Sequence, residues 1–166
     1  TIDTLERLLN KIKELLPNRI IFLGDVFHDN SAFDRLKTKE KQLFKDILKK
    51  NVIWVKGNHD NKFKYVDIKT YTSYRLNNFI FSHISNKKNK LEISAHYHPK
   101  VTFKFKGTKV SKPCFLIDKE KIILPAYGSY TGGLNISSDI YKNLFLNDYQ
   151  IYALGNTKVL KIEKKF

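Results

Sequence analysis

The first part of the chain alternates between two spacings of apolar side chains. Residues 2–16 carry them every three or four positions, which is typical of an amphipathic helix, and Pro17 ends that pattern. The short apolar run RIIFLGD (19–25) leads into a turn and predicts a buried strand. Residues 37–50 return to helical spacing, and NVIWVKGN (51–58) is a second buried run. The order helix, strand, helix, strand predicts that the two strands pair in parallel.

The remainder of the chain predicts mainly short strands. β-Branched or aromatic runs are separated by polar or glycine-containing turns: YTSYRL, NFIFSH, LEISAH, VTFKFKG, KPCFLI and KIILPAY. Asn77-Asn78 indicates a hairpin turn. The alternation in VTFKFK predicts a half-buried strand with Phe103 and Phe105 on its core side. Residues 131–148 predict a loop with a short helix, and QIYALG with TKVLKIE predicts a closing hairpin.

The bulk properties indicate one folded α/β domain over residues 1–166. The chain has no repeat, no low-complexity linker and no break in composition, and it is long enough to bury a core. No apolar run reaches the roughly eighteen residues of a membrane helix, so we expect no membrane partner. The N-terminus has a helical pattern rather than a signal sequence, and the single cysteine, Cys114, excludes an internal disulfide. We therefore expect a cytoplasmic location.

The net charge favours a polyanionic partner. It is +15, from 31 basic and 16 acidic residues, and basic side chains release counterions when they neutralise phosphates. Nucleic acid is the expected partner on this ground. The excess is nearly all lysine, however, and a lysine-rich composition also arises from genome bias, so a solvated lysine surface is the alternative.

The histidines indicate a site. Each of the 5 lies at or just beyond the end of an apolar run, in the order His28, His59, His83, His96 and His98. Ligands at the carboxyl ends of parallel strands converge in one crevice, and the mixture of His, Asp and Asn donors suits Mn²⁺, Fe²⁺ or Zn²⁺.

Individually, these motifs have ordinary structural explanations. Gly24-Asp25 is typical of a turn, and His83 alone fits a core histidine as well as a ligand. If the chain continues extended after LEISA, His96 and His98 lie on the same side of it, as metal ligands would. The recurrence of histidine at every strand end is what favours a site.

The order of these motifs resembles that of the calcineurin-like metallophosphoesterases. The matching segments are GDVFH (24–28), GNHD (57–60), Ser82-His83 after an apolar strand, and Ala95-His96-Tyr97-His98 as a variant of Gly-His-x-His. The later segments ISAHYHPKVTFKFKG, KPCFLI and ILPAYGSYTGG are similar to the branch of ligase-associated DNA-damage-response endonucleases. GDVFHDN is similar to nuclease subunits of double-strand-break repair complexes. The resemblance runs from about Leu5 to Gly133 and implies a β-sandwich of mixed sheets flanked by helices.

The resemblance implies two divalent metal ions. Mn²⁺ is the expected ion, with Mg²⁺, Fe²⁺ or Zn²⁺ as alternatives. By this resemblance Asp25 bridges the two ions, and Asn58, His83 and His96 complete the second site. His98 binds the first ion.

The resemblance also implies the catalytic residues. His59 stands beside the scissile phosphate, where it stabilises charge or protonates the leaving oxygen. His28 and Asn58 lie near the substrate phosphate. Asp60 orients the imidazole of His59.

One part of the family pattern is absent. The family opens with a strand that ends in Asp-x-His, and this sequence has no histidine before Asp25. The first metal keeps only Asp25 and His98, so we expect the second site to be the better formed. Ala95 replaces the usual glycine. The chain is a fragment, takes the strand from a partner chain, or is a degenerate member; the lack of Met favours a fragment.

Three functions follow from this combination. The leading hypothesis is a metal-dependent phosphoesterase that hydrolyses phosphodiesters in nucleic acid, as a DNA endonuclease does. The second is the same chemistry on a small phosphodiester or a nucleotide. The third is a non-catalytic binding protein with an incomplete metal site. A cluster of lysines on the rim of the His96–His98 site would favour nucleic acid; the candidates are Lys100, Lys104, Lys106, Lys109 and Lys112.

Overall fold

A computed structural model describes residues 2–29, 31–60, 68–128, 131–145 and 148–163. The first part of the chain forms a 3-stranded parallel sheet in the order β1-β2-β3. Its elements are α1 (Ile2–Leu15), β1 (Ile20–Leu23), α2 (Thr38–Leu48), β2 (Val52–Val55) and β3 (Thr70–Tyr71). The predicted helices and the predicted parallel pairing are confirmed. Within the described residues β1 pairs only with β2, so it lies at the edge of this sheet.

The second part of the chain forms an 8-stranded mixed sheet. Its path is β11-β10-β8-β9-β6-β5-β4, and β7 pairs with β8 outside that path. Strands β5, β6 and β9 run parallel to one another, and the other pairs are antiparallel. The strands are β4 (Ser73–Leu76), β5 (Phe79–Ser82), β6 (Glu92–Ser94), β7 (Lys100–Phe105), β8 (Thr108–Ile117), β9 (Lys121–Ile123), β10 (Gln150–Leu154) and β11 (Val159–Ile162), and one helix, α3, covers Asp139–Leu144.

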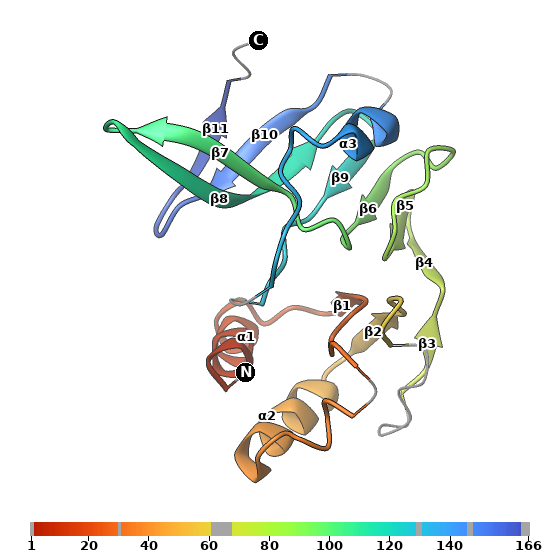
Figure 1. The fold of residues 1–166 in the computed structure, drawn as a ribbon. Helices are drawn as coiled ribbons and strands as arrows, with labels where there is room; N and C mark the ends of the chain where they lie inside the picture. Colours follow the sequence, from red (N-terminus) through yellow and green to blue (C-terminus); the bar gives the residue numbers. More distant parts are fainter. Residues whose placement is uncertain (1, 30, 61–67, 129–130, 146–147, 164–166) are drawn as a thin grey trace.

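Each sheet has its own core. Figure 1 shows the small sheet with α1 and α2 in the lower half of the molecule, and the large sheet above it with α3. An aromatic cluster of Phe33, Phe44 and Trp54 joins α2 to the small sheet. On the large sheet, Tyr141 and Leu144 of α3 pack over buried residues of β7, β8, β9 and β10. The mixed α/β fold with two sheets and flanking helices is therefore as expected.

Three strand predictions need correction. YTSYRL divides at Thr72, so that β3 belongs to the small sheet and β4 to the large one. KPCFLI is the end of a longer strand, because β8 has 10 residues and begins at Thr108. Phe103 packs against the core as predicted, but the side chain of Phe105 is 56% exposed. Phe105 ends β7, at a point that the core does not reach.

A buried ion pair fixes the segment between β5 and β6. Glu92 and Lys121 are paired residues on β6 and β9, and Lys121 Nζ lies 3.1 Å from Glu92 Oε2. The hydroxyls of Ser82 and Ser85 donate to the Glu92 carboxylate over 2.9 and 2.6 Å. Lys121 Nζ also donates to the carbonyls of Asn86 and Asn89. Because every member of this network has partners, the pair holds the segment that follows β5 in one conformation.

The same contacts shift the pKa of Glu92. Burial alone would raise it, but the hydrogen bonds from Ser85, Asn89 and Ser82, together with the Lys121 ammonium, bring the pKa of Glu92 below its usual value. The charged carboxylate is therefore favoured in the folded protein.

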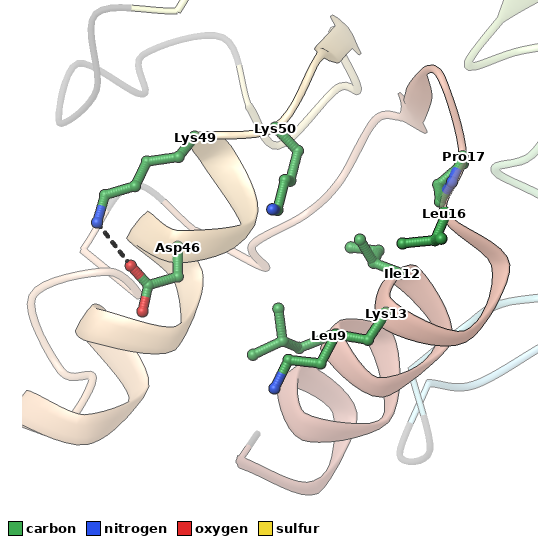
Figure 2. Close-up of a pocket in the computed structure, with 8 residues that line it drawn as sticks. All are labelled: Leu9, Ile12, Lys13, Leu16, Pro17, Asp46, Lys49 and Lys50. Carbon is green, nitrogen blue, oxygen red and sulfur yellow. Dashed lines mark hydrogen bonds and ion pairs between the residues drawn. The ribbon is translucent and has the colours of Figure 1, made fainter.

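One hollow lies between α1 and α2, away from the strand ends that precede the histidines. It has a volume of about 500 Å³ and contains none of the histidines (Figure 2). Its lining combines apolar and charged side chains: Leu9, Ile12, Lys13, Leu16, Pro17, Asp46, Lys49 and Lys50. In the portion of the chain described, no helix has the length and apolar character needed to cross a bilayer.

We expect Lys121→Met to lower the free energy of unfolding by about 3–5 kcal/mol, because it leaves the Glu92 charge buried without its partner. The matched control is Lys142→Met, which breaks an ion pair with Asp139 whose side chains are 74% and 83% exposed. Because solvent screens this exposed pair, that change should have little effect on the free energy of unfolding. Urea unfolding measures both values, and equal losses would contradict a structural role for the buried pair.

We also expect the Glu92 carboxylate to contribute to the acid sensitivity of the fold. Its pKa is lowered on folding, so its stabilisation is complete above the unfolded value of about 4.3 and is lost as the pH falls through the folded value. In Glu92→Gln, the free energy of unfolding should fall less steeply over this acid range than in the wild type. Urea unfolding at a series of pH values tests this, and parallel curves would contradict it.

Candidate metal centre

The candidate site lies where parallel strands of both sheets end. In the small sheet Leu23 is level with Val55, so the segments that follow β1 and β2 leave the sheet side by side. In the large sheet Ser82 is level with Ser94, and the amide of Ala95 donates to the carbonyl of His83 over 3.1 Å. The carboxyl ends of the two strand pairs meet, which explains why residues far apart in the sequence form one site.

Two glycines allow the segments after β1 and β2 to touch. A Cβ atom on Gly24 would lie 2.5 Å from His83 Nδ1 and 2.6 Å from the Cα of Gly57. A Cβ on Gly57 would lie 2.0 Å from Asp25 Oδ1. Gly24 has a φ of +80° and Asp25 has a φ of 50°, so the backbone turns sharply there. This left-handed turn presents the Asp25 carboxylate to the large sheet.

Asp60 joins the same two segments through a single carboxylate oxygen. Its Oδ2 accepts hydrogen bonds from the backbone N–H of Asp25 over 2.6 Å and from that of Gly57 over 3.1 Å. It also accepts the indole N–H of Trp54 over 3.1 Å. The residue is buried at 5% exposure. These bonds place Asp60 behind Asp25, whereas the sequence analysis assigned it to the imidazole of His59.

Donor atoms from both sheets converge on His83. Its Nδ1–H donates to the carbonyl of Leu23 over 2.6 Å, so Nε2 is the ring nitrogen that faces the cluster. Around Nε2 lie Asp25 Oδ2 at 3.1 Å, Asn58 Oδ1 at 3.0 Å and His96 Nδ1 at 3.0 Å. The carboxylate and the amide oxygen are acceptors only. A divalent cation satisfies such a set of nitrogen and oxygen donors.

The compactness of this cluster fits a single ion. Ligand atoms of Asp25, His83 and His96 all lie within 4.8 Å of one another, and His83 is buried. The structure thus brings together the residues predicted for the second metal, with Asn58 beside them. It does not include His98 in this compact group, within the residues that it describes.

The backbone around His96 and His98 differs from the predicted one. Strand β6 ends at Ser94, and both histidines have positive φ, 61° and 45°. The amide of Tyr97 donates to the carbonyl of Ala95 over 2.7 Å, which closes a tight turn. The extended conformation expected for this segment is therefore wrong. The strained turn, rather than strand alternation, directs His96 to His83.

The remaining histidines lie around this cluster. Burial lowers the pKa of His96, and the nearby His83 lowers it further, with a smaller effect from His59. Burial also lowers the pKa of His98, followed by the charges of His96 and His83, and more weakly by that of His28. Low pKa values keep these imidazoles neutral, as metal ligands must be. His28 and His59 are exposed, and the backbone N–H of His59 donates to Asp25 Oδ1 over 2.8 Å.

Comparison with known proteins decides the family. The profile described as "Calcineurin-like phosphoesterase" matches residues 1–160. The chain belongs to the calcineurin-like phosphoesterase family. The match extends beyond Gly133, where the sequence resemblance had ended, so β10 and β11 are part of the family domain. The family places this phosphoesterase among the metal-dependent hydrolases of phosphoric esters.

A solved structure supports the same assignment. The phosphoesterase is similar to the nuclease MPE of Pseudomonas putida, with a TM-score of 0.76 and 26% sequence identity. The similarity covers 98% of this chain and 80% of the nuclease chain. No curated protein sequence matches the phosphoesterase.

Some of the residues that hold the site in place are not indicated by any clear pattern in the sequence. Glu92 and Ser85 hold the segment that follows His83, yet neither belongs to a motif with a histidine. An acidic residue at the start of one buried strand, LEIS, and a lysine at the start of another, KIIL, are the only signs of the buried pair. Their partnership depends on the pairing of β6 with β9, which is a property of the sheet topology.

We expect Gly57→Ala to disturb the metal centre of this phosphoesterase. The added methyl would meet Asp25 Oδ1, so the carboxylate must move and the fold should lose about 1–3 kcal/mol of stability. Mn²⁺ binding, measured by titration calorimetry, should weaken. The control is Gly132→Ala, since a Cβ there has no atom within 4 Å. Unchanged Mn²⁺ affinity in Gly57→Ala would contradict the ligand role of Asp25.

Proposed function

We propose that this phosphoesterase hydrolyses phosphodiester bonds in nucleic acid, with DNA as the preferred substrate and Mn²⁺ as the working ion. The observation that carries the proposal is the convergence of Asp25, Asn58, His83 and His96 on one point at the joint between the sheets. The similarity to a nuclease and the net charge of +15 support a nucleic acid over a small phosphodiester.

The residues around this point have two proposed roles: some bind the ion, and others transfer protons. Asp25, His83 and His96, with the amide oxygen of Asn58, would hold a divalent ion. When bound there, such an ion supplies Lewis-acid chemistry to the phosphate and activates water for attack. Asp60 keeps the Asp25 backbone in place through its hydrogen bond to the amide, so its role is to position a ligand.

His59 is the proposed general acid. Its backbone is tied to the Asp25 carboxylate, while its side chain is exposed beside the cluster. An imidazole in this place can give a proton to the leaving oxygen of a phosphodiester, a contribution worth about 10²–10⁴-fold in rate. His28, which is exposed and close enough to affect the pKa of His98, is proposed to contact the substrate phosphate.

We expect two variants to separate these roles with a DNA oligonucleotide as the substrate, because the alkoxide that leaves from DNA needs a proton, whereas a nitrophenolate does not. His59→Ala should lower kcat by about 10²–10⁴-fold while Mn²⁺ binds as in the wild type, because the ion's ligands remain. His83→Ala should weaken Mn²⁺ binding and abolish turnover together, because it removes the central ligand. Addition of EDTA should stop the wild type, and fresh Mn²⁺ should restore it.

Either of two results would sink this proposal. One is wild-type protein that binds Mn²⁺ but shows no turnover of DNA or of bis-p-nitrophenyl phosphate, which would favour a non-catalytic binding protein. The other is wild-type cleavage of DNA by the His59→Ala variant. Equal rates on DNA and on the small ester would instead favour a small-molecule phosphodiesterase.

A further inference from the structure

The β7–β8 hairpin, residues 100–113, is a concentrated source of positive charge. It carries Lys100, Lys104, Lys106, Lys109 and Lys112, and the sequence contains no acidic residue between Ile93 and Ile117. The ion pairs formed among the described residues do not include any of these lysines. The charge of the hairpin is therefore not neutralised within the described part of the molecule.

The strand register arranges part of this charge on one face. Lys104 lies directly opposite Lys109, and Thr102 lies opposite Ser111 on the same face. Lys100 points to that face as well, because it is two and four residues before Thr102 and Lys104. Like charges in a cross-strand pair destabilise a sheet, so the pairing of Lys104 with Lys109 does not serve the fold. A polyanion would relieve the repulsion.

The other two lysines lie elsewhere. Lys106 is exposed in the turn, with a φ of 48°, and Lys112 is opposite Val101 on the face that turns to the core. The five lysines therefore do not all gather on the rim of the histidine site. Lys100, Lys104 and Lys109 form a line of charge along one face of the hairpin, Lys106 lies at its tip, and Lys112 is on the other face.

An exposed aromatic ring lies at the tip of the hairpin, on the face opposite Lys104 and Lys109, because Phe105 alternates with Lys104 along β7. Phe105 is 56% exposed, and Lys106 Nζ lies 5.9 Å from the centre of its ring. The core explains Phe103 but not Phe105. Basic side chains beside an exposed aromatic ring are the combination with which proteins bind single-stranded nucleic acid, since phosphates contact the lysines and an unpaired base stacks on the ring.

The hairpin begins at the metal centre. Lys100 follows His98 by two residues, and its Nζ lies 3.5 Å from the carbonyl oxygen of Thr131. From Lys100, β7 extends about 17 Å to Phe105. Figure 1 shows the β7–β8 hairpin extending beyond the rest of the large sheet. A strand of nucleic acid with one phosphate at the metal centre can therefore lie along the charged face.

We propose that the β7–β8 hairpin binds a single-stranded segment of nucleic acid that passes over its tip, with Lys100, Lys104 and Lys109 on its phosphates on one face and Phe105, beside Lys106, stacked on an unpaired base on the other. This inference rests on the proposed function, since it extends the substrate path outward from the metal centre. An acidic protein could also bind the lysines, but it would not need an aromatic ring. The test therefore separates nucleic acid from an acidic protein.

The test measures binding of a fluorescein-labelled oligothymidylate by anisotropy in EDTA, which prevents cleavage, at several salt concentrations. In Lys104→Gln/Lys109→Gln the slope of log K against log salt should become shallower by about 1.4, because two phosphate contacts are lost. Phe105→Leu should weaken binding at least about fivefold, and Phe105→Tyr, which keeps a ring, should bind as the wild type does. The control Lys158→Gln/Lys161→Gln removes two exposed lysines from the β10–β11 hairpin and should leave the slope unchanged.

A wild-type salt slope in the Lys104/Lys109 variant, or one equal to that of the control, would overturn the proposal. If Phe105→Leu binds the oligothymidylate as tightly as the wild type does, Phe105 does not stack on an unpaired base. The hairpin would then be only a charged surface, to which an acidic protein could also bind. Turnover of bis-p-nitrophenyl phosphate by the wild-type protein is measured in parallel. It tests the proposed function separately from the hairpin, because this ester is too small to reach from the metal centre to Phe105. The two ideas therefore fail by different measurements.

Discussion

One oxygen of the Asp60 carboxylate holds two neighbouring segments of the small sheet in contact. It accepts the backbone amides of Asp25 and Gly57, so the exits of β1 and β2 cannot separate without breaking buried hydrogen bonds. The glycine at 57 is needed because the approach leaves no room for a Cβ. Asp25 is thereby forced into a left-handed turn, and its carboxylate points at His83 rather than into solvent. The ligand geometry of the small sheet follows from this constraint.

The large sheet holds its part of the cluster in place by a different set of contacts. Its ligands follow β5 and β6, and the buried carboxylate of Glu92 fixes the segment after His83 through the hydroxyls of Ser82 and Ser85. His96 is placed by a strained turn instead. In both sheets a buried carboxylate organises the backbone near a residue of the cluster. His28 and His59 at the edge of the site are exposed, whereas the carboxylates that support it are buried.

Local sequence pattern predicted most of the elements and the position of the histidines after apolar runs, because helical and strand spacing are local. The grouping of Asn58 with His83, which lie 25 positions apart and follow strands of different sheets, came from the resemblance to the metallophosphoesterases. What the pattern could not predict depends on non-local pairing. The partnership of Glu92 with Lys121 needs the neighbours of β6 and β9 to be known, and the turn at His96 runs against strand alternation. The exposure of Phe105 likewise reflects where the core ends, which the alternation within β7 does not encode.

Because the proposed ligands are divided between two sheets, a bound metal ion would hold the two sheets together. Asp25 and Asn58 come from the small sheet, and His83 and His96 come from the large one. An ion that binds the assembled site stabilises the packing of one sheet on the other, by about 2.7 kcal/mol when its free concentration is 100 times its dissociation constant. If these residues bind the ion, its supply would affect the free energy of unfolding as well as activity. Protein without the ion would then be easier to unfold and degrade.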